Sequence, residues 1–189
     1  FLDDARQADM LIHVVDISGS TDLQGQHVNV GSHDPREDIK FVEEEFDYWF
    51  KQILEREWQK LSKEIEKKST KLADGITDRF SGLGVKVHEV HEILQSLGLL
   101  TKKPTEWNDS DITKFAQMLR KKIKPMLIAA NKADLCKDLE ITNEIHRNRE
   151  IVNCSAETEL LLKKAAKANL IDYIPGNEKF VINKNVDIS

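Results

Sequence analysis

Three short apolar runs, separated by stretches with helical periodicity, dominate the hydrophobic pattern of the chain. They lie at residues 11–16, 126–130 and 151–154, and a polar residue closes or follows each of them. Short runs rich in aliphatic and β-branched residues are typical of strands buried in a parallel sheet, and helices commonly connect such strands. The pattern therefore predicts an α/β fold.

A long helical segment follows the first run. Residues 36–68 contain neither proline nor glycine, and their apolar residues recur every three or four positions. Asp34 and Pro35 provide a capping carboxylate and a first-turn proline, with which helices commonly begin. We therefore expect one helix of about thirty residues, roughly 45 Å long at 1.5 Å per residue. Its apolar positions are Ile39, Val42, Phe46, Trp49, Ile53, Leu54, Trp58, Leu61 and Ile65.

Two more helical patterns precede the second run. One ends near Gly98, and the other extends from Asp109 towards Pro125. The first shares the heptad-like spacing of the long segment, so we expect the two to pack as an antiparallel, coiled-coil-like hairpin. For such apolar stripes, packing in a core is favoured over a ligand site. The chain thus divides into an α/β domain, residues 1–34 and 124–189, and a helical insertion, residues 35–123.

The sequence Asn131-Lys132-Ala133-Asp134 directly follows the second run. Guanine presents a ring N–H and an exocyclic amine side by side, and one carboxylate can accept both in a strong bidentate pair. Asp134 is the candidate for that role, and adenine would leave it unpaired. The amide of Asn131 can donate to the base and brace the loop, while the stem of Lys132 can lie along the purine face. Open α/β sheets bind their ligands at this position, after a strand.

A second candidate element for guanine recognition follows the third run. Ser155-Ala156-Glu157 occupies the position at which GTPases place a Ser-Ala pair whose backbone N–H binds the guanine oxygen. The alternative interpretation is a polar turn after a strand, but the placement of both elements after apolar runs favours the guanine site. The predicted guanine-binding set is Asn131, Lys132, Asp134, Ser155, Ala156 and Glu157.

The usual means of holding nucleotide phosphates is absent from the sequence. A loop of the form G-x-x-x-x-G-K-[ST] occurs nowhere in the 189 residues, and we assign no catalytic residue. The histidines do not indicate a metal site. One histidine pair, His27 and His33, lies near Asp34 in the sequence, and a second pair is His88 and His91. Neither pair has the spacing of a metal-ligand set.

Composition narrows the choice of partners. The net charge of −5 gives no general attraction to nucleic acid. Basic residues are nonetheless frequent between Lys51 and Lys71 and in the run of residues 120–124. A solvated helix face with i,i+4 ion pairs is the favoured interpretation, and contact with an RNA phosphate backbone is the alternative.

The same composition predicts a cytoplasmic protein with no membrane partner. No apolar run approaches the roughly 18 residues that span a bilayer, and no signal peptide pattern opens the chain. The two cysteines, Cys136 and Cys154, are too few for a disulfide framework.

Four segments carry a family resemblance. They are residues 1–9, the run 11–16 with Ser18-Gly19-Ser20-Thr21-Asp22 after it, the helix start at residues 34–39, and residues 151–176. Together they resemble the Obg-related GTPases of the YchF-like branch. The intact Asn131-Lys132-Ala133-Asp134 is similar to the archaeal-type members of that branch, and implies guanine rather than adenine.

The resemblance implies a translation-associated GTPase that acts on GTP, with GDP as product and Mg²⁺ as cofactor, and that contacts the ribosome or RNA. The family's phosphate loop, first switch, D-x-x-G element and TGS domain have no counterpart in this chain, so its catalytic and magnesium-binding residues map onto no position here. The chain would then be the C-terminal part of a P-loop GTPase domain. We expect upstream residues in the natural protein, and no GTP hydrolysis by this fragment alone.

A second hypothesis belongs to a different class. The chain could be a non-catalytic helical interaction module that binds RNA or the ribosome and carries a degenerate nucleotide-binding fold. Preference for guanine over adenine nucleotides separates the two hypotheses.

Overall fold

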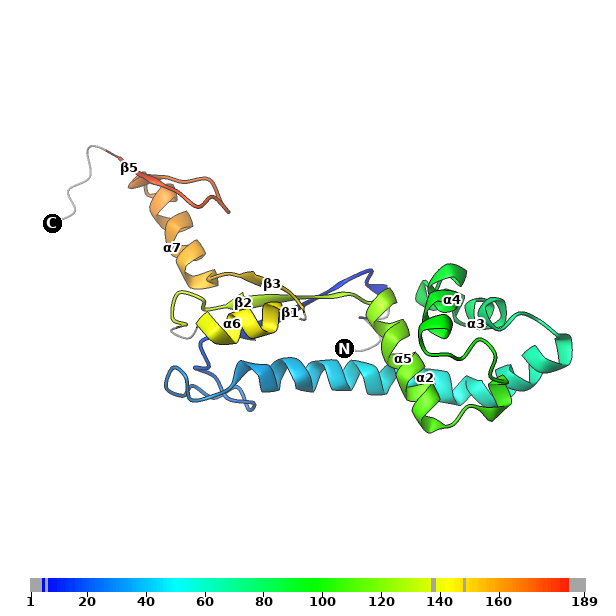
Figure 1. Cartoon of the computed structure of the whole chain (residues 1–189). Helices are drawn as coiled ribbons and strands as arrows, with labels where there is room; N and C mark the ends of the chain where they lie inside the picture. The colour runs from blue at the N-terminus through cyan, green and yellow to red at the C-terminus, as the bar shows by residue number, and fades with distance from the viewer. Residues whose placement is uncertain (1–4, 6, 137–138, 148, 184–189) are drawn as a thin grey trace. The chain divides into compact units, whose positions relative to one another are not determined.

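The computed structural model describes residue 5 and residues 7–136, 139–147 and 149–183 (Figure 1). Most of the opening segment that contributes to the family resemblance, residues 1–4 and 6, lies outside them. The chain forms two compact units. We call residues 1–12 and 39–127 the helical unit and residues 13–38 and 128–189 the sheet unit. The division predicted from the sequence, at residues 34 and 124, stays a prediction.

Helix α2 extends over Pro35–Lys68, so the predicted long helix is confirmed. The Asp34 carboxylate caps its first turn by accepting a hydrogen bond from the backbone N–H of Arg36 at 2.9 Å. Acidic residues in the first turn and lysines in the last turn complement the helix dipole. The helix ends before Ser69, whose φ of 52° is left-handed.

Three shorter helices follow α2 in the helical unit. Helix α5 begins and ends where the sequence predicted, and the side chain of Asn108 accepts a hydrogen bond from the backbone N–H of Asp111 at its first turn. Short 3-10 turns connect the helices. The elements are α3 (Leu72–Phe80), η1 (Ser81–Leu83), α4 (Val87–Ser96), η2 (Pro104–Glu106) and α5 (Asp109–Ile123).

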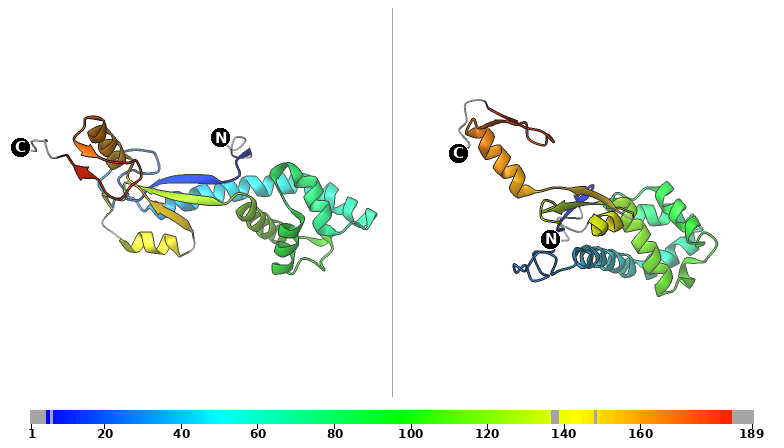
Figure 2. Two further views of the ribbon diagram at one scale, coloured as in Figure 1. Left: turned by 90° about the horizontal axis from the view of Figure 1, so that it is seen from above. Right: turned by 60° about the vertical axis from the view of Figure 1, so that its left-hand side comes forward.

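The predicted antiparallel, coiled-coil-like pairing of the second apolar segment with the long helix is not confirmed and stays a prediction. The second apolar pattern forms a helix of only ten residues. The chain turns at Gly84, whose φ of 79° is a left-handed conformation that ends a helix, so Leu83 lies in a 3-10 turn. Helices α3, α4 and α5 instead share one core with α2, and Figure 2 shows their arrangement from two further directions.

Large apolar side chains from all four helices fill the core of the helical unit, as the periodicity predicted. Trp58 and Trp107 stack with their ring centroids 4.4 Å apart, and the ring of Phe115 packs edge-on against Trp107 at 5.3 Å. The indole N–H of Trp58 donates to the carbonyl of Pro104 at 3.2 Å, so this buried polar atom is satisfied. Other core residues are Phe50, Leu54, Leu61, Ile65, Ile76, Phe80, Val90, Leu94 and Leu119.

Three strands form a parallel sheet in the order β1 (Leu11–Asp16), β2 (Met126–Asn131) and β3 (Glu150–Asn153). All three predicted strands are therefore confirmed, as is the α/β fold class. Ile128 and Ala130 of the central strand are buried, and so is Val15 of β1. In the sheet unit, helix α6 (Leu139–His146) precedes β3 and helix α7 (Ala156–Lys167) follows it.

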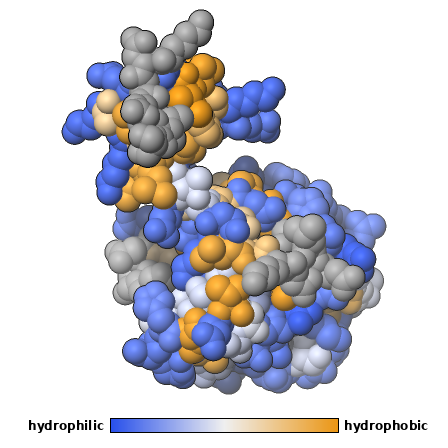
Figure 3. Space-filling model, turned by 90° about the vertical axis from the view of Figure 1, so that its left-hand side faces the viewer, coloured by the Kyte–Doolittle hydropathy of each residue, from blue (hydrophilic) through white to orange (hydrophobic). Residues whose placement is uncertain are grey.

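A small antiparallel hairpin that the sequence did not predict follows α7. Strand β4 (Ile171–Asp172) pairs with β5 (Val181–Ile182), with Ile171 opposite Ile182. Apolar side chains are exposed over α7 and this hairpin, at the top of the view in Figure 3. They are Leu160, Leu161, Leu170, Ile174, Phe180, Val181 and Ile182.

No helix of the described residues is long and apolar enough to cross a membrane. Helix α2 has 34 residues, but charged residues recur along its whole length.

The aromatic contact in the helical unit predicts a large effect of one substitution. Phe115 is fully buried, so Phe115→Ala should lower the free energy of unfolding by about 3–5 kcal/mol, measured by chemical denaturation. Phe41→Ala is the matched control, because Phe41 is 59% exposed. The control should stay within about 0.5 kcal/mol of the parent chain. Equal losses in the two variants would contradict the assigned core.

Candidate functional site

The carboxyl ends of the three parallel strands are joined by backbone hydrogen bonds. The N–H of Ile17, after β1, donates to the carbonyl of Asn131 at 3.0 Å. The N–H of Cys154, after β3, donates to Ala130 at 2.9 Å, and the N–H of Ala133 donates back to Cys154 at 3.1 Å. The loops after β1, β2 and β3 are therefore held at one edge of the sheet, where open α/β sheets bind their ligands.

We call residues 131–134 the base loop. It begins at the end of β2 and turns at once, because Lys132 has a left-handed φ of 60°. The carbonyl of Lys132 then accepts a hydrogen bond from the N–H of Leu135 at 3.0 Å. A non-glycine residue in this conformation carries backbone strain, which persists only where its surroundings hold it in place.

The ammonium group of Lys132 is held within the protein. It donates to Asp16 Oδ2 at 2.6 Å and to the hydroxyl oxygens of Ser20 and Thr21 at 2.9 and 3.1 Å. From the sequence, a role was predicted only for the stem of this side chain. The structure assigns the ammonium a protein partner, and leaves the stem of Lys132 as the part that a base could contact.

Asp16 contacts the base loop, and sequence reasoning did not include it in the candidate site. Its Oδ1 accepts from the backbone N–H and the hydroxyl of Ser18 at 3.0 and 2.6 Å. Its Oδ2 accepts from the hydroxyls of Ser20 and Thr21 at 2.8 and 2.7 Å, in addition to Lys132. The signal in the sequence was an aspartate at a strand end followed by three hydroxyl residues within five positions.

This setting keeps the Asp16 carboxylate ionised. Burial raises the pKa of Asp16, but hydrogen bonds from Lys132 and the three hydroxyl residues lower it by more, so the net pKa lies well below its usual range. Because the pKa is lower in the folded chain than in the unfolded chain, the interaction stabilises the fold above the usual pKa of an aspartate. That contribution is lost as the pH falls towards the folded-state pKa.

Asn131 braces the second predicted guanine element. Its side-chain Oδ1 accepts a hydrogen bond from the backbone N–H of Ala156 at 3.0 Å. Ser155 caps α7 and accepts a hydrogen bond from the N–H of Thr158 at 3.2 Å. The predicted bracing role of Asn131 is thus visible in the structure. The Ala156 N–H that was expected to meet a guanine oxygen is bonded to Asn131 here.

The remaining two members of the predicted set are exposed. Asp134 lies in the base loop, and within the described residues its carboxylate has no hydrogen-bond or ion-pair partner. Glu157 lies in the first turn of α7, where its charge favours the helix N-terminus. The structure therefore groups Asn131, Lys132, Ser155 and Ala156 by direct contacts and leaves the carboxylate of Asp134 available to a ligand.

The loop between β1 and α2 folds back on itself beside this site. Gly31 donates its N–H to the carbonyl of Ser18 at 2.8 Å, and His33 donates to the carbonyl of Gly19 at 3.2 Å. Gly19 has a φ of 60°, and a Cβ there would lie 2.1 Å from the carbonyl oxygen of His33. Only glycine fits this position, which fixes the segment that carries Ser18 and Ser20.

A pocket of about 390 Å³ lies against this loop in the sheet unit. Its charged groups are already paired, since Arg36 bonds Asp34 and Glu144 and His33 lies 3.0 Å from Asp38. Cys136 lines the pocket, whereas Cys154 is exposed. Among the described residues, no group of three or more His, Cys, Asp or Glu side chains is placed to hold a metal ion.

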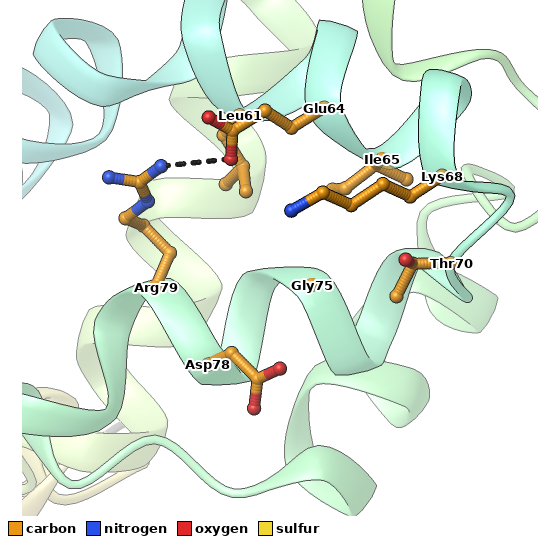
Figure 4. Close-up of a pocket in the computed structure, with 8 residues that line it drawn as sticks. All are labelled: Leu61, Glu64, Ile65, Lys68, Thr70, Gly75, Asp78 and Arg79. Atoms are coloured by element: carbon orange, nitrogen blue, oxygen red, sulfur yellow. Dashed lines mark hydrogen bonds and ion pairs between the residues drawn. The ribbon is translucent and has the colours of Figure 1, made fainter.

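A second pocket, of about 380 Å³, lies between α2 and α3 in the helical unit (Figure 4). Its guanidinium group, from Arg79, pairs with Glu57 at 3.1 Å and with Glu64 at 3.2 Å. Gly75 lies so close to α2 that a Cβ would be 2.6 Å from Ile65 Cγ1. We interpret this pocket as an ion-paired groove between closely packed helices and assign it no ligand.

The basic run of residues 120–124 is only partly accessible, because Lys121 and Lys122 are exposed whereas Arg120 and Lys124 are buried. Arg120 is buried and donates to Asp47 at 2.7 Å. Lys124 is also buried, and its ammonium donates to the carbonyl of Ala8. Lys122 pairs with Glu92 at 3.3 Å. Three of the four basic side chains of this run are therefore bonded within the helical unit, and the RNA contact considered for the run stays a prediction.

The chain is similar to known proteins over part or most of its length. Residues 129–189, which contain the base loop from Asn131 onwards, match the family described as Obg-like GTPase YGR210-like, G4 motif-containing domain. A GTP-binding protein of Methanocaldococcus jannaschii is 37% identical over 174 residues, which cover 90% of this chain and 43% of that protein. A GTP-binding protein of Schizosaccharomyces pombe is 32% identical over 182 residues, covering 94% and 44%.

A solved structure is similar as well. The crystal structure of a GTP-binding protein from Pyrococcus horikoshii OT3 has a TM-score of 0.78 and 44% sequence identity, over 93% of this chain and 51% of that one. Each of these three proteins is named as a GTP-binding protein, and each match covers at least 90% of this chain. The chain spans less than half the length of the two curated relatives. The YchF-like branch and the description of the chain as a fragment stay predictions.

The close approach at Gly19 gives a testable prediction. Gly19→Ala should lower the free energy of unfolding by more than about 2 kcal/mol, because the new Cβ meets a backbone carbonyl and the residue needs a positive φ. Thermal or denaturant unfolding measures this change. Gly25→Ala is the control, since Gly25 also has a positive φ, 77°, but no atom lies within 4 Å of the added Cβ. The control should lose only about 1 kcal/mol, and an equal loss in both variants would contradict the close contact.

Proposed function

We propose that this chain forms the guanine-recognition part of a GTP-binding protein. One observation carries the proposal: at the carboxyl edge of the sheet, Asn131 braces Ala156 while the exposed Asp134 carboxylate has no partner among the described residues. Such a carboxylate suits the two adjacent donors of guanine. The names of the relatives, all GTP-binding proteins, agree with the proposal.

The proposed roles follow from the geometry. Asp134 accepts from the ring N–H and the exocyclic amine of guanine, and an adenine base would leave the carboxylate unpaired. The stem of Lys132, whose ammonium is tied to Asp16, packs along the purine face. Ser155 and Ala156 supply the second guanine element, which is joined to the base loop through Asn131, and Glu157 completes the predicted set.

We propose that phosphate binding and GTP hydrolysis belong to other parts of a longer protein. The sequence has no glycine-rich phosphate loop, and the relatives are more than twice as long as the matched segment. A magnesium ion in such a protein would neutralise the nucleotide phosphates. The described residues offer no cluster that fits it, so its ligands are expected outside them.

The base assignment predicts a change of specificity. In the natural full-length protein, Asp134→Asn should weaken GDP binding at least about 100-fold and improve binding of xanthosine diphosphate, because the amide offers xanthine a complementary edge. Calorimetric titration with GDP, XDP and ADP measures the preference. Glu150→Gln, which removes an exposed carboxylate at the other end of β3, should change none of the three affinities. An unchanged GDP-to-XDP ratio in Asp134→Asn would refute the role of Asp134.

A specific observation supports a second function for the helical unit. Four basic residues on α2 are exposed, and among the described residues none of them has an ion-pair partner. Their spacing of four, three and four places them on one helix face, opposite the buried Leu54, Trp58, Leu61 and Ile65. The four residues, which we call the basic stripe, are Arg56, Lys60, Lys63 and Lys67.

The neighbouring acidic residues do not neutralise the stripe, because they are used elsewhere. Glu57 and Glu64 pair with Arg79. Glu66 accepts the N–H and hydroxyl of Thr105 at 3.0 and 2.6 Å. These three glutamates therefore do not form the i,i+4 ion pairs that were expected for this part of the helix. We propose that the basic stripe contacts the phosphate backbone of RNA, of which ribosomal RNA is the form that the family resemblance implies.

Salt dependence tests the basic stripe. The triple variant with Lys60, Lys63 and Lys67 changed to Gln should bind structured RNA more weakly, and the slope of log K against log salt should become shallower by about 2–3. The control changes Lys40, Lys122 and Lys163, each of which is paired with a glutamate, to Gln. It alters the net charge equally and should leave the slope nearly unchanged. Equal effects of the two variants would show that only net charge matters.

A further inference from the structure

We propose that Asp16 is the positioning residue of the base loop, holding Lys132 and the left-handed turn around it in the binding conformation before a nucleotide arrives. The juxtaposition of Asp16 and Lys132 carries the inference. This inference extends the proposed guanine site, and its link to nucleotide binding rests on that proposed function. Its effect on the loop itself can be measured without any ligand.

Lys132 is fixed at both ends. At the backbone, its φ of 60° starts the turn that leads to Asp134. At the tip, the ammonium donates to three oxygens between 2.6 and 3.1 Å away, on Asp16, Ser20 and Thr21. A lysine side chain ordinarily samples many rotamers, and fixing it costs conformational entropy. With both ends held, the stem is presented as a defined apolar surface.

Asp16 can act as an anchor because the loop after β1 fixes it in turn. Five hydrogen bonds reach its two oxygens, from Lys132 and from the backbone or hydroxyl groups of three neighbouring residues. Only 12% of its side chain is exposed, against 30% for Lys132. The carboxylate also stays charged, since its pKa is held well below the usual range. Asp16 thus remains in place whether or not a ligand is present.

The proposed role is distinct from base reading. Asp16 bonds the ammonium at the tip of Lys132 and is not the proposed base reader, so it should not decide between guanine and other bases. That choice belongs to Asp134. Losing the Asp16 contact should weaken the binding of GDP and XDP by the same factor, because both purines would pack on the stem of Lys132.

A double-mutant cycle on the natural full-length protein tests the role. Asp16→Asn should lower GDP affinity by about tenfold or more, since a hydrogen bond to a charged group contributes about that factor, and should leave the GDP-to-XDP ratio unchanged. Lys132→Met should show a similar loss, and the double variant should be no worse than Lys132→Met alone. Asp22→Asn is the matched control. Asp22 lies in the same loop and caps its own turn through the N–H groups of Gln24 and Gln26.

Amide hydrogen exchange supplies the readout that needs no ligand. In the nucleotide-free protein, Asp16→Asn and Lys132→Met should each speed exchange at Ala133, whose N–H bonds Cys154, while Asp22→Asn should not. Lys132 is partly exposed, so Lys132→Met keeps the test available even if Asp16→Asn fails to fold. Unchanged exchange at Ala133 in Lys132→Met overturns the proposal, and so do additive effects in the cycle.

The two proposals fail in different ways. If the parent protein binds no guanine nucleotide but both variants loosen the base loop, the guanine function is wrong and the positioning role of Asp16 stands. If the parent protein binds GDP and the variants at positions 16 and 22 lose affinity equally, the positioning role is wrong and the guanine function stands.

Discussion

The ion pair between Asp16 and Lys132 is the interaction on which the candidate site depends. It joins the end of β1 to the turn after β2 and holds a lysine in a backbone conformation that costs about 1–3 kcal/mol. Removing a carboxylate from water is also unfavourable, and a single partner seldom compensates for it. Here the five hydrogen bonds to Asp16 supply the compensation. A partly exposed ion pair adds little to the free energy of unfolding. The main effect of this pair is therefore to define the geometry of the base loop.

In the helical unit, tertiary contacts separate the acidic from the basic side chains of α2. Its acidic and basic residues alternate in the sequence, which suggested mutual neutralisation by local pairs. In the structure, Glu57, Glu64 and Glu66 instead bond to Arg79 and Thr105, which belong to the segments after α2. The lysines that would otherwise balance them face the solvent. A helix with a balanced composition can therefore present one basic face when tertiary contacts use its acidic residues.

Local signals made much of the fold predictable. A capping aspartate, a first-turn proline and uninterrupted periodicity defined α2, and short apolar runs defined the three strands. The base loop was found because its four residues are contiguous. Asp16 was missed because its partner Lys132 is 116 residues away, and nothing in the local pattern reports such a pairing. The burial of Arg120 was missed for the same kind of reason, since tertiary packing decides it.

Among the described residues, the base loop forms hydrogen bonds within the sheet unit itself, to Asp16, Ser20, Thr21, Cys154 and Ala156. A preformed base site has a larger effect on which base is selected than on the affinity of the whole nucleotide. Hydrogen bonds to a charged group contribute about 1.5–3 kcal/mol each, enough to discriminate between bases. The affinity of a nucleotide also draws on its charged phosphates, and the sequence contains no glycine-rich phosphate loop to hold them. Base specificity and nucleotide affinity would thus reside in separate segments of polypeptide. The ion pair between Asp16 and Lys132 would hold the base loop in its binding conformation, and a separate segment would bind the phosphates.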